Sequence, residues 1–110
     1  GQMRDFVHVA DVARANVLAL QAVVDGADGF AAYNISSGRP VSILEVARHV
    51  SAGSDGPAPE VTGGYRLGDV RHIVASPERA RADLGFVAEV GPDEGLREFA
   101  TAPLRGHQDV

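Results

Sequence analysis

The chain has 110 residues and a formal net charge of −5, with 45% hydrophobic and only 5% aromatic residues. Its length fits one small domain or a piece of a larger one, and its acidic balance argues against a general nucleic-acid-binding protein. The absence of cysteine excludes disulfides and cysteine-based metal sites, and no apolar run approaches the ~20 residues that a bilayer-spanning helix needs. We therefore expect a cytoplasmic protein whose partners include neither nucleic acid nor membrane.

The composition also points to a chain that depends on a neighbour. The apolar residues are mainly Val, Ala and Leu, with no Trp, which predicts a thin core. The first residue is not Met, and a strand-like segment starts at once, whereas native domains usually open with a frayed terminus. We expect the chain to be part of a longer protein.

All ten basic residues are arginine, and the chain contains no lysine. The arginine side chain ends in a planar fork of five donors that suits phosphate oxygens. A GC-rich genome would also favour arginine over lysine. The two explanations are compatible, because genome bias does not decide where each side chain points.

In chain order, residues 4–9 alternate in a way that predicts a short β-strand. A helix is expected next, because apolar residues recur at spacings of 4, 3 and 4 and make one stripe, namely Ala13, Val17, Leu20 and Val24. Asp11 lies in the first turn of this helix, where the positive helix end favours a carboxylate, and Gly26 is the expected stop. Residues 31–36 predict a second strand, and 37–40 a turn.

The second half begins with a strong helix signal, because Ser42 and Glu45 match the capping-box pattern. A Gly/Pro/Ser-rich connection follows at 51–64. The remaining expected elements are a short strand near 72–75, a helix from 76 to 84, a helix from 92 to about 103, and a loose tail at 106–110. Strands and helices alternate, which predicts a mixed α/β piece. The strands are too few and too short for an independent doubly wound domain, so much of their pairing surface must lie elsewhere.

Two short motifs carry residues suited to phosphate chemistry. Arg4 opens the strand, and an arginine there either holds a phosphate with two parallel hydrogen bonds or forms a surface pair with Asp5 or another acid. The segment 66–69 (Arg-Leu-Gly-Asp) is either a ligand-binding turn, in which Asp69 accepts from a ribose hydroxyl, or a turn closed by an Arg–Asp pair. The residues alone leave both alternatives open.

The histidines are interpreted as structural. His8 alternates with valines on the expected strand, and a structural role is favoured for Arg71 and His72, although both could reach a nucleotide. The four histidines show no His-x-x-x-His or similar spacing, so no metal site is expected.

The run Arg-Asp-Phe-Val-His-Val at 4–9 and the run Tyr-Arg-Leu-Gly-Asp-Val-Arg-His at 65–72 resemble motifs of a known family. They are similar to the C-terminal part of the extended short-chain dehydrogenase/reductase family, the NAD-dependent nucleotide-sugar epimerases and dehydratases. The resemblance continues through the Leu-Gly-Phe ending at 84–86 and covers the chain from residue 1 to about 104. Residues 33–38 resemble the family's Tyr-Asn-Ile-Gly-x-Gly strand end, with Ser36 in place of the first Gly, where a backbone angle reserved for Gly would be strained.

The resemblance implies that Arg4 and Arg66 contact the substrate's diphosphate and that Asp69 lies near the ribose. It also implies that the complete enzyme uses NAD and a catalytic Tyr–Lys pair. Because this chain has no Gly-rich dinucleotide fingerprint and no lysine, we expect it to contain no catalytic and no cofactor-binding residue.

The resemblance further implies that 1–110 is one C-terminal segment. Residues 4–9 and 37–104 would belong to a substrate-binding subdomain, and 10–36 would be the edge helix and strand of the Rossmann-type dinucleotide-binding domain. The expected function is that of a segment of an NAD(P)-dependent nucleoside-diphosphate-sugar epimerase. A 4-epimerase acting on dTDP- or UDP-sugars is favoured, homodimeric when complete, and the segment alone would be inactive.

The alternative is a stand-alone, non-catalytic module that binds a nucleotide or a partner protein. The coding region upstream of Gly1 distinguishes the two. A Gly-x-x-Gly-x-x-Gly fingerprint and a Tyr-x-x-x-Lys there favour the epimerase, whereas a start site immediately upstream favours the module.

Overall fold

The structure, a computed structural model, describes residues 1–103, so the expected tail at 106–110 lies outside it. Within these residues the chain forms four helices, α1 (Val9–Val24), α2 (Ile43–Ser54), α3 (Glu78–Leu84) and α4 (Pro92–Thr101). The same range contains three two-residue strands, β1 (Met3–Arg4), β2 (Val41–Ser42) and β3 (His72–Ile73). The mixed α/β fold that the alternation of elements predicts is confirmed.

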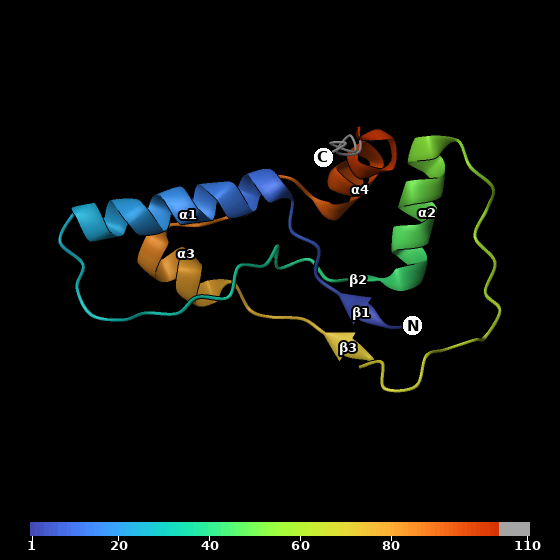
Figure 1. Cartoon of the computed structure of the whole chain (residues 1–110), viewed down its shortest axis with the longest axis horizontal. Helices are drawn as coiled ribbons and strands as arrows, with labels where there is room; N and C mark the ends of the chain where they lie inside the picture. The colour runs from blue at the N-terminus through green and yellow to red at the C-terminus, as the bar shows by residue number, and fades with distance from the viewer. Residues whose placement is uncertain (104–110) are drawn as a thin grey trace, which may run out of the picture.

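The strands form one small sheet in the order β2-β1-β3. β1 runs antiparallel to β2 and parallel to β3. In Figure 1, α1 and α3 lie together to the left of this sheet, whereas α4 lies above it and packs beside α2. The first strand of the chain therefore joins two segments that lie far along the sequence.

The strands are shorter than the sequence predicts. The strand expected at 4–9 ends at Arg4. His8 instead caps α1, because its Nδ1 accepts a hydrogen bond of 3.1 Å from the amide of Ala10. Residues 31–36 form no strand, since no described residue pairs with them in a ladder. A strand persists only where a neighbour accepts its backbone hydrogen bonds, so the prediction at 31–36 is wrong and that at 4–9 is too long.

Ser36, which stands where the family pattern has glycine, carries no backbone strain. Its φ is not positive, and in the described part of the chain the non-glycine residue with a positive φ is Asp55. The Ser36 side chain is buried, and its Oγ donates a hydrogen bond of 3.0 Å to the carbonyl of Ala75. This bond ties the segment before β2 to the segment after β3.

Two helix boundaries follow the capping signals, whereas α3 begins at Glu78 rather than at 76. Ser42 and Glu45 form the expected capping box at the start of α2, with Ser42 Oγ 3.2 Å from the Glu45 amide and Glu45 Oε2 2.7 Å from the Ser42 amide. Gly85 ends α3 with a left-handed φ of +68°. The helix α2 continues to Ser54, so the irregular connection begins after that residue rather than at 51.

The main core lies between α1 and α3 and is small. Ala15, Ala80 and Phe86 are buried at its centre, and the side chains packed against them are Leu18, Tyr33, Ile35, Leu84 and Ala88. The apolar stripe of α1 does not face this core. Three of its members, Val17, Leu20 and Val24, are 64%, 65% and 71% exposed. The helix thus buries one face and leaves a second apolar face uncovered by the described residues.

Asp11 holds α1 to the segment that leads into α4. Its buried carboxylate accepts hydrogen bonds from the amides of Glu89 (3.1 Å) and Val90 (3.0 Å), and Arg14 donates a third at 3.2 Å. Burial alone would raise the pKa of the Asp11 carboxyl. The two amides and Arg14 outweigh burial, so this pKa lies below its ordinary value of 3.8.

We expect Asp11→Asn to lower the free energy of unfolding by about 1.5–3 kcal/mol, the range for hydrogen bonds to a charged group. The reason is that an amide offers one oxygen to two backbone donors. The matched control is Asp28→Asn at an exposed position, which should change stability by less than about 0.5 kcal/mol. Urea unfolding of the 110-residue chain measures both variants.

The wild type and Asp11→Asn should also differ in how their stability depends on pH. Because the pKa of Asp11 is depressed in the folded state, its contribution is present above the ordinary value of 3.8 and is lost as the pH falls through the folded-state pKa. The difference in free energy of unfolding between wild type and Asp11→Asn should therefore become smaller as the pH is lowered from about 7 to about 2. A difference of equal size at both values would contradict the assignment.

Candidate functional site

Arg4, the last residue of β1, points its guanidinium at backbone carbonyls. Its Nη1 donates to the carbonyl of Met3 at 2.8 Å and to that of Arg71 at 3.1 Å, and its Nη2 donates to the carbonyl of Val70 at 2.8 Å. The surface pair with Asp5 that the sequence allowed is not formed, because the Asp5 carboxylate has other partners. Arg4 therefore binds the two peptide groups that directly precede β3.

Asp5 binds on the opposite flank of the same strand. Its Oδ1 accepts a hydrogen bond of 2.8 Å from the amide of Ser37, and its Oδ2 accepts one of 3.0 Å from the amide of Gly38. Neighbouring residues of opposite charge thus fix two separate segments to the end of β1. The sequence shows that Asp5 follows Arg4. It does not reveal the partners of Asp5, because these are backbone amides, which every residue except proline has.

Arg66 and Asp69 lie in the turn just before the carbonyls that Arg4 binds. The amide of Asp69 donates to the carbonyl of Arg66 at 3.3 Å, and Arg66 Nε lies 3.2 Å from Asp69 Oδ2. Gly68 takes a φ of +86° in this turn, a conformation that side chains rarely adopt. The Arg66 side chain is 87% exposed and that of Asp69 30% exposed. The turn closed by an Arg–Asp pair is therefore formed, with its arginine open to solvent.

The structure ties Arg4 to the segment that carries Arg66 and Asp69, through the carbonyl next to Asp69. Arg4 comes from β1, whereas Arg66 and Asp69 come from the connection before β3, and the carbonyl of Val70 links them. The two neighbours of unassigned role behave differently. Arg71 contributes its carbonyl to the junction, and His72 is an exposed residue of β3.

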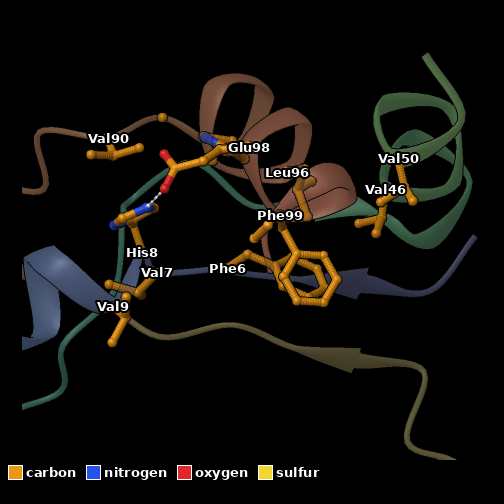
Figure 2. A pocket seen from close by; sticks show the side chains of 14 residues that line it. Phe6, Val7, His8, Val9, Val46, Val50, Val90, Leu96, Glu98 and Phe99 are labelled. Atoms are coloured by element: carbon orange, nitrogen blue, oxygen red, sulfur yellow. Dashed lines mark hydrogen bonds and ion pairs between the residues drawn. The ribbon is translucent and has the colours of Figure 1, made fainter. Parts of the chain in front are cut away.

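His8 has a structural role in addition to its cap. Since its Nδ1 accepts from the Ala10 amide, the ring proton is assigned to Nε2, which lies 3.2 Å from Oε1 of Glu98 (Figure 2). This contact links α4 to the start of α1. In the described residues no group of three or more His, Asp or Glu side chains is arranged to hold a metal ion.

An apolar cavity lies away from the arginine junction. It has a volume of about 500 Å³ and is lined mainly by apolar side chains from the segment after β1, α2 and α4. Figure 2 shows Phe6, Val46, Val50, Leu96 and Phe99 around it. Because the walls are mainly apolar, they offer few groups that could bind a phosphate.

In residues 1–103 no helix is long and apolar enough to cross a membrane.

Comparison with known proteins identifies the family. Residues 1–36 match the sequence model of the NAD dependent epimerase/dehydratase family. The chain is 33% identical over 96 residues to a UDP-glucose 4-epimerase of Cyamopsis tetragonoloba and 36% identical over 98 residues to a dTDP-L-rhamnose 4-epimerase of Burkholderia thailandensis. The chain belongs to the NAD dependent epimerase/dehydratase family. These matches cover 87% and 89% of the chain but only 27% and 26% of the two relatives.

Solved structures of epimerases have the same fold over this region. The UDP-glucose 4-epimerase of Bifidobacterium longum, in complex with NAD+ and UDP, superposes with a TM-score of 0.71 at 31% identity. That of Stenotrophomonas maltophila, with bound NAD and formylated UDP-arabinopyranose, gives 0.77 at 30% identity. Each match covers 87% of this chain and 28% of the solved one. The fold of this epimerase/dehydratase family member thus matches the C-terminal part of the Rossmann-type enzymes.

The contacts of the two arginines predict different effects on stability. Arg4→Ala should lower the free energy of unfolding by about 1–2 kcal/mol, because it removes charge-assisted bonds that fix β1 to the segment before β3. Arg66→Ala should change it by less than about 0.5 kcal/mol, since its pair with Asp69 is exposed. Thermal or urea unfolding of the two variants checks this. Equal losses in both would refute the difference in role.

Proposed function

We propose that this chain is the C-terminal segment of an NAD(P)-dependent nucleoside-diphosphate-sugar epimerase, with a 4-epimerase favoured. Its role in that enzyme is to bind the diphosphate of the nucleotide sugar. The observation that carries the proposal is the junction where Arg4 meets the segment of Arg66 and Asp69. Two guanidinium groups from separate parts of the chain are the groups expected around a diphosphate. The 4-epimerase preference rests on the relatives, which are named UDP-glucose 4-epimerase and dTDP-L-rhamnose 4-epimerase.

In this proposal each site residue has a distinct task. Arg4 and Arg66 neutralise and orient the diphosphate, and Asp69 accepts a hydrogen bond from a ribose hydroxyl. The bare backbone of Gly68 lets the ligand approach the turn closely. These contacts lie remote from the sugar carbon that reacts, so their binding energy serves to position the sugar for the chemistry.

In this proposal the cofactor binds outside this chain. The sequence contains no Gly-rich dinucleotide fingerprint and no lysine. The proposal therefore assigns NAD and the catalytic Tyr–Lys pair to the remainder of a longer enzyme, with a UDP- or dTDP-linked sugar as the substrate and a homodimer as the assembly. The segment on its own would be inactive.

The exposed face of α1 supports the proposed division of the chain. Residues 10–36 would form the edge of the dinucleotide-binding domain, and 4–9 with 37–104 the substrate-binding subdomain. The exposed side chains of Val17, Leu20 and Val24 form an apolar surface that a neighbouring domain would cover. Since the chain spans about a quarter of its curated relatives, the remaining protein is large enough to supply that cover.

The binding role is tested in the complete enzyme. Arg66→Ala should weaken the binding of UDP or dTDP by about 1.5–3 kcal/mol, the range for a hydrogen bond to a charged group. The matched control is Arg81→Ala on α3, an exposed arginine paired with Glu78, which should leave the affinity unchanged. Calorimetric titration measures both variants. Equal affinity in Arg66→Ala and wild type would remove Arg66 from the site.

The uncovered face predicts that the isolated 110-residue chain self-associates. Leu20→Glu should reduce this association, because it places a charge in the middle of the apolar stripe. The control Ala52→Glu, at an exposed position of α2, should not. Sedimentation at several concentrations measures the effect. A wild-type monomer with a cooperative thermal transition would instead support the stand-alone module.

A further inference from the structure

The partners of Arg4 leave its positive charge available. All three are neutral carbonyl oxygens, those of Met3, Val70 and Arg71. A guanidinium has five N–H donors, and these contacts use both hydrogens of Nη1 and one of Nη2. The Nε hydrogen and the second Nη2 hydrogen find no acceptor among residues 1–103. Arg4 is therefore fixed in place without being neutralised.

Arg66 has the complementary arrangement. Its Nε is engaged by Asp69, while its two Nη groups have no other partner in the described part of the chain. One arginine is thus pinned through its Nη groups and the other through its Nε. Each keeps donors that could meet an anion.

The turn that carries Arg66 has few anchors apart from Arg4. The chain between α2 and β3 contains no helix or strand, and the neighbours Tyr65 and Leu67 are 84% and 96% exposed. The end of this connection is held at the carbonyl of Arg71, which accepts from the Met3 amide at 3.2 Å and from Arg4. Removing Arg4 leaves only one of these two bonds and frees the carbonyl of Val70.

We propose that Arg4 is also the positioning residue of the Arg66–Asp69 turn, so that the two arginines act on a bound diphosphate as a coupled pair. This inference rests on the proposed function. By gripping the carbonyls of Val70 and Arg71, Arg4 orders the turn before the ligand arrives. Without that grip, ligand binding has to order the turn itself, and Arg66 contributes less to affinity.

The coupling is measured by a double-mutant cycle in the complete enzyme, with UDP as the probe and calorimetry as the readout. Arg4→Ala and Arg66→Ala should each weaken binding, and the loss in the double variant should be smaller than the product of the two single losses by about fivefold or more. Losses that simply multiply would overturn the positioning role. If both single variants bound UDP as wild type does, the proposed function itself would fail.

A second readout needs no ligand. Hydrogen exchange of the Asp69 amide, which donates to the Arg66 carbonyl across the turn, should speed up in the free Arg4→Ala protein but not in Arg81→Ala. If Arg4→Ala does not fold, Arg4→Lys takes its place, because it keeps the positive charge but lacks the planar guanidinium. Arg4→Lys should also speed exchange of the Asp69 amide while retaining part of the UDP affinity. Unchanged exchange in both Arg4 variants would show that Arg4 does not order the turn.

Discussion

Charged side chains bound to backbone groups hold this chain together. Arg4 grips the carbonyls of Val70 and Arg71, and Asp5 and Asp11 each accept two backbone amides. A charged hydrogen bond to a peptide group is stronger than a neutral one and needs no oppositely charged side chain. Three charged residues within 4–11 therefore anchor segments from across the sequence.

This mode of attachment offsets a small core. Ala15, Ala80 and Phe86 are buried at its centre, and only 5% of the residues are aromatic. Arg14 extends the pattern, because it donates to Asp11 and stacks on Phe86 with its guanidinium carbon 5.2 Å from the ring centroid. Polar ties of this kind specify where segments lie, while apolar burial supplies most of the stabilisation. Because this chain buries little apolar surface, its shape depends on these polar contacts.

The sequence predicted the features that are local. The capping box of Ser42 and Glu45 and the stop at Gly85 depend on neighbouring residues, and both are present. It also predicted the family, because motif residues keep their spacing whatever surrounds them. The mixed α/β class followed from the order of the elements.

The predictions that were wrong concern features that depend on residues far away in the sequence. The strand expected at 31–36 needs a neighbouring strand that the described residues do not supply, and the stripe on α1 faces solvent for the same reason. For the candidate site, the types of Arg4, Arg66 and Asp69 were readable from the motifs. The grip of Arg4 on two carbonyls was not, because backbone atoms are identical at every position and leave no trace in a sequence.

The reach of these ties has a consequence for biosynthesis. Asp5 binds residues 32 and 33 positions ahead, Arg4 binds residues 66 and 67 ahead, and Asp11 binds residues 78 and 79 ahead. During synthesis the partners of Asp5 emerge first, those of Arg4 next and those of Asp11 last. Each carboxylate or guanidinium stays hydrated until its own partners have been made, and each later bond closes a longer loop.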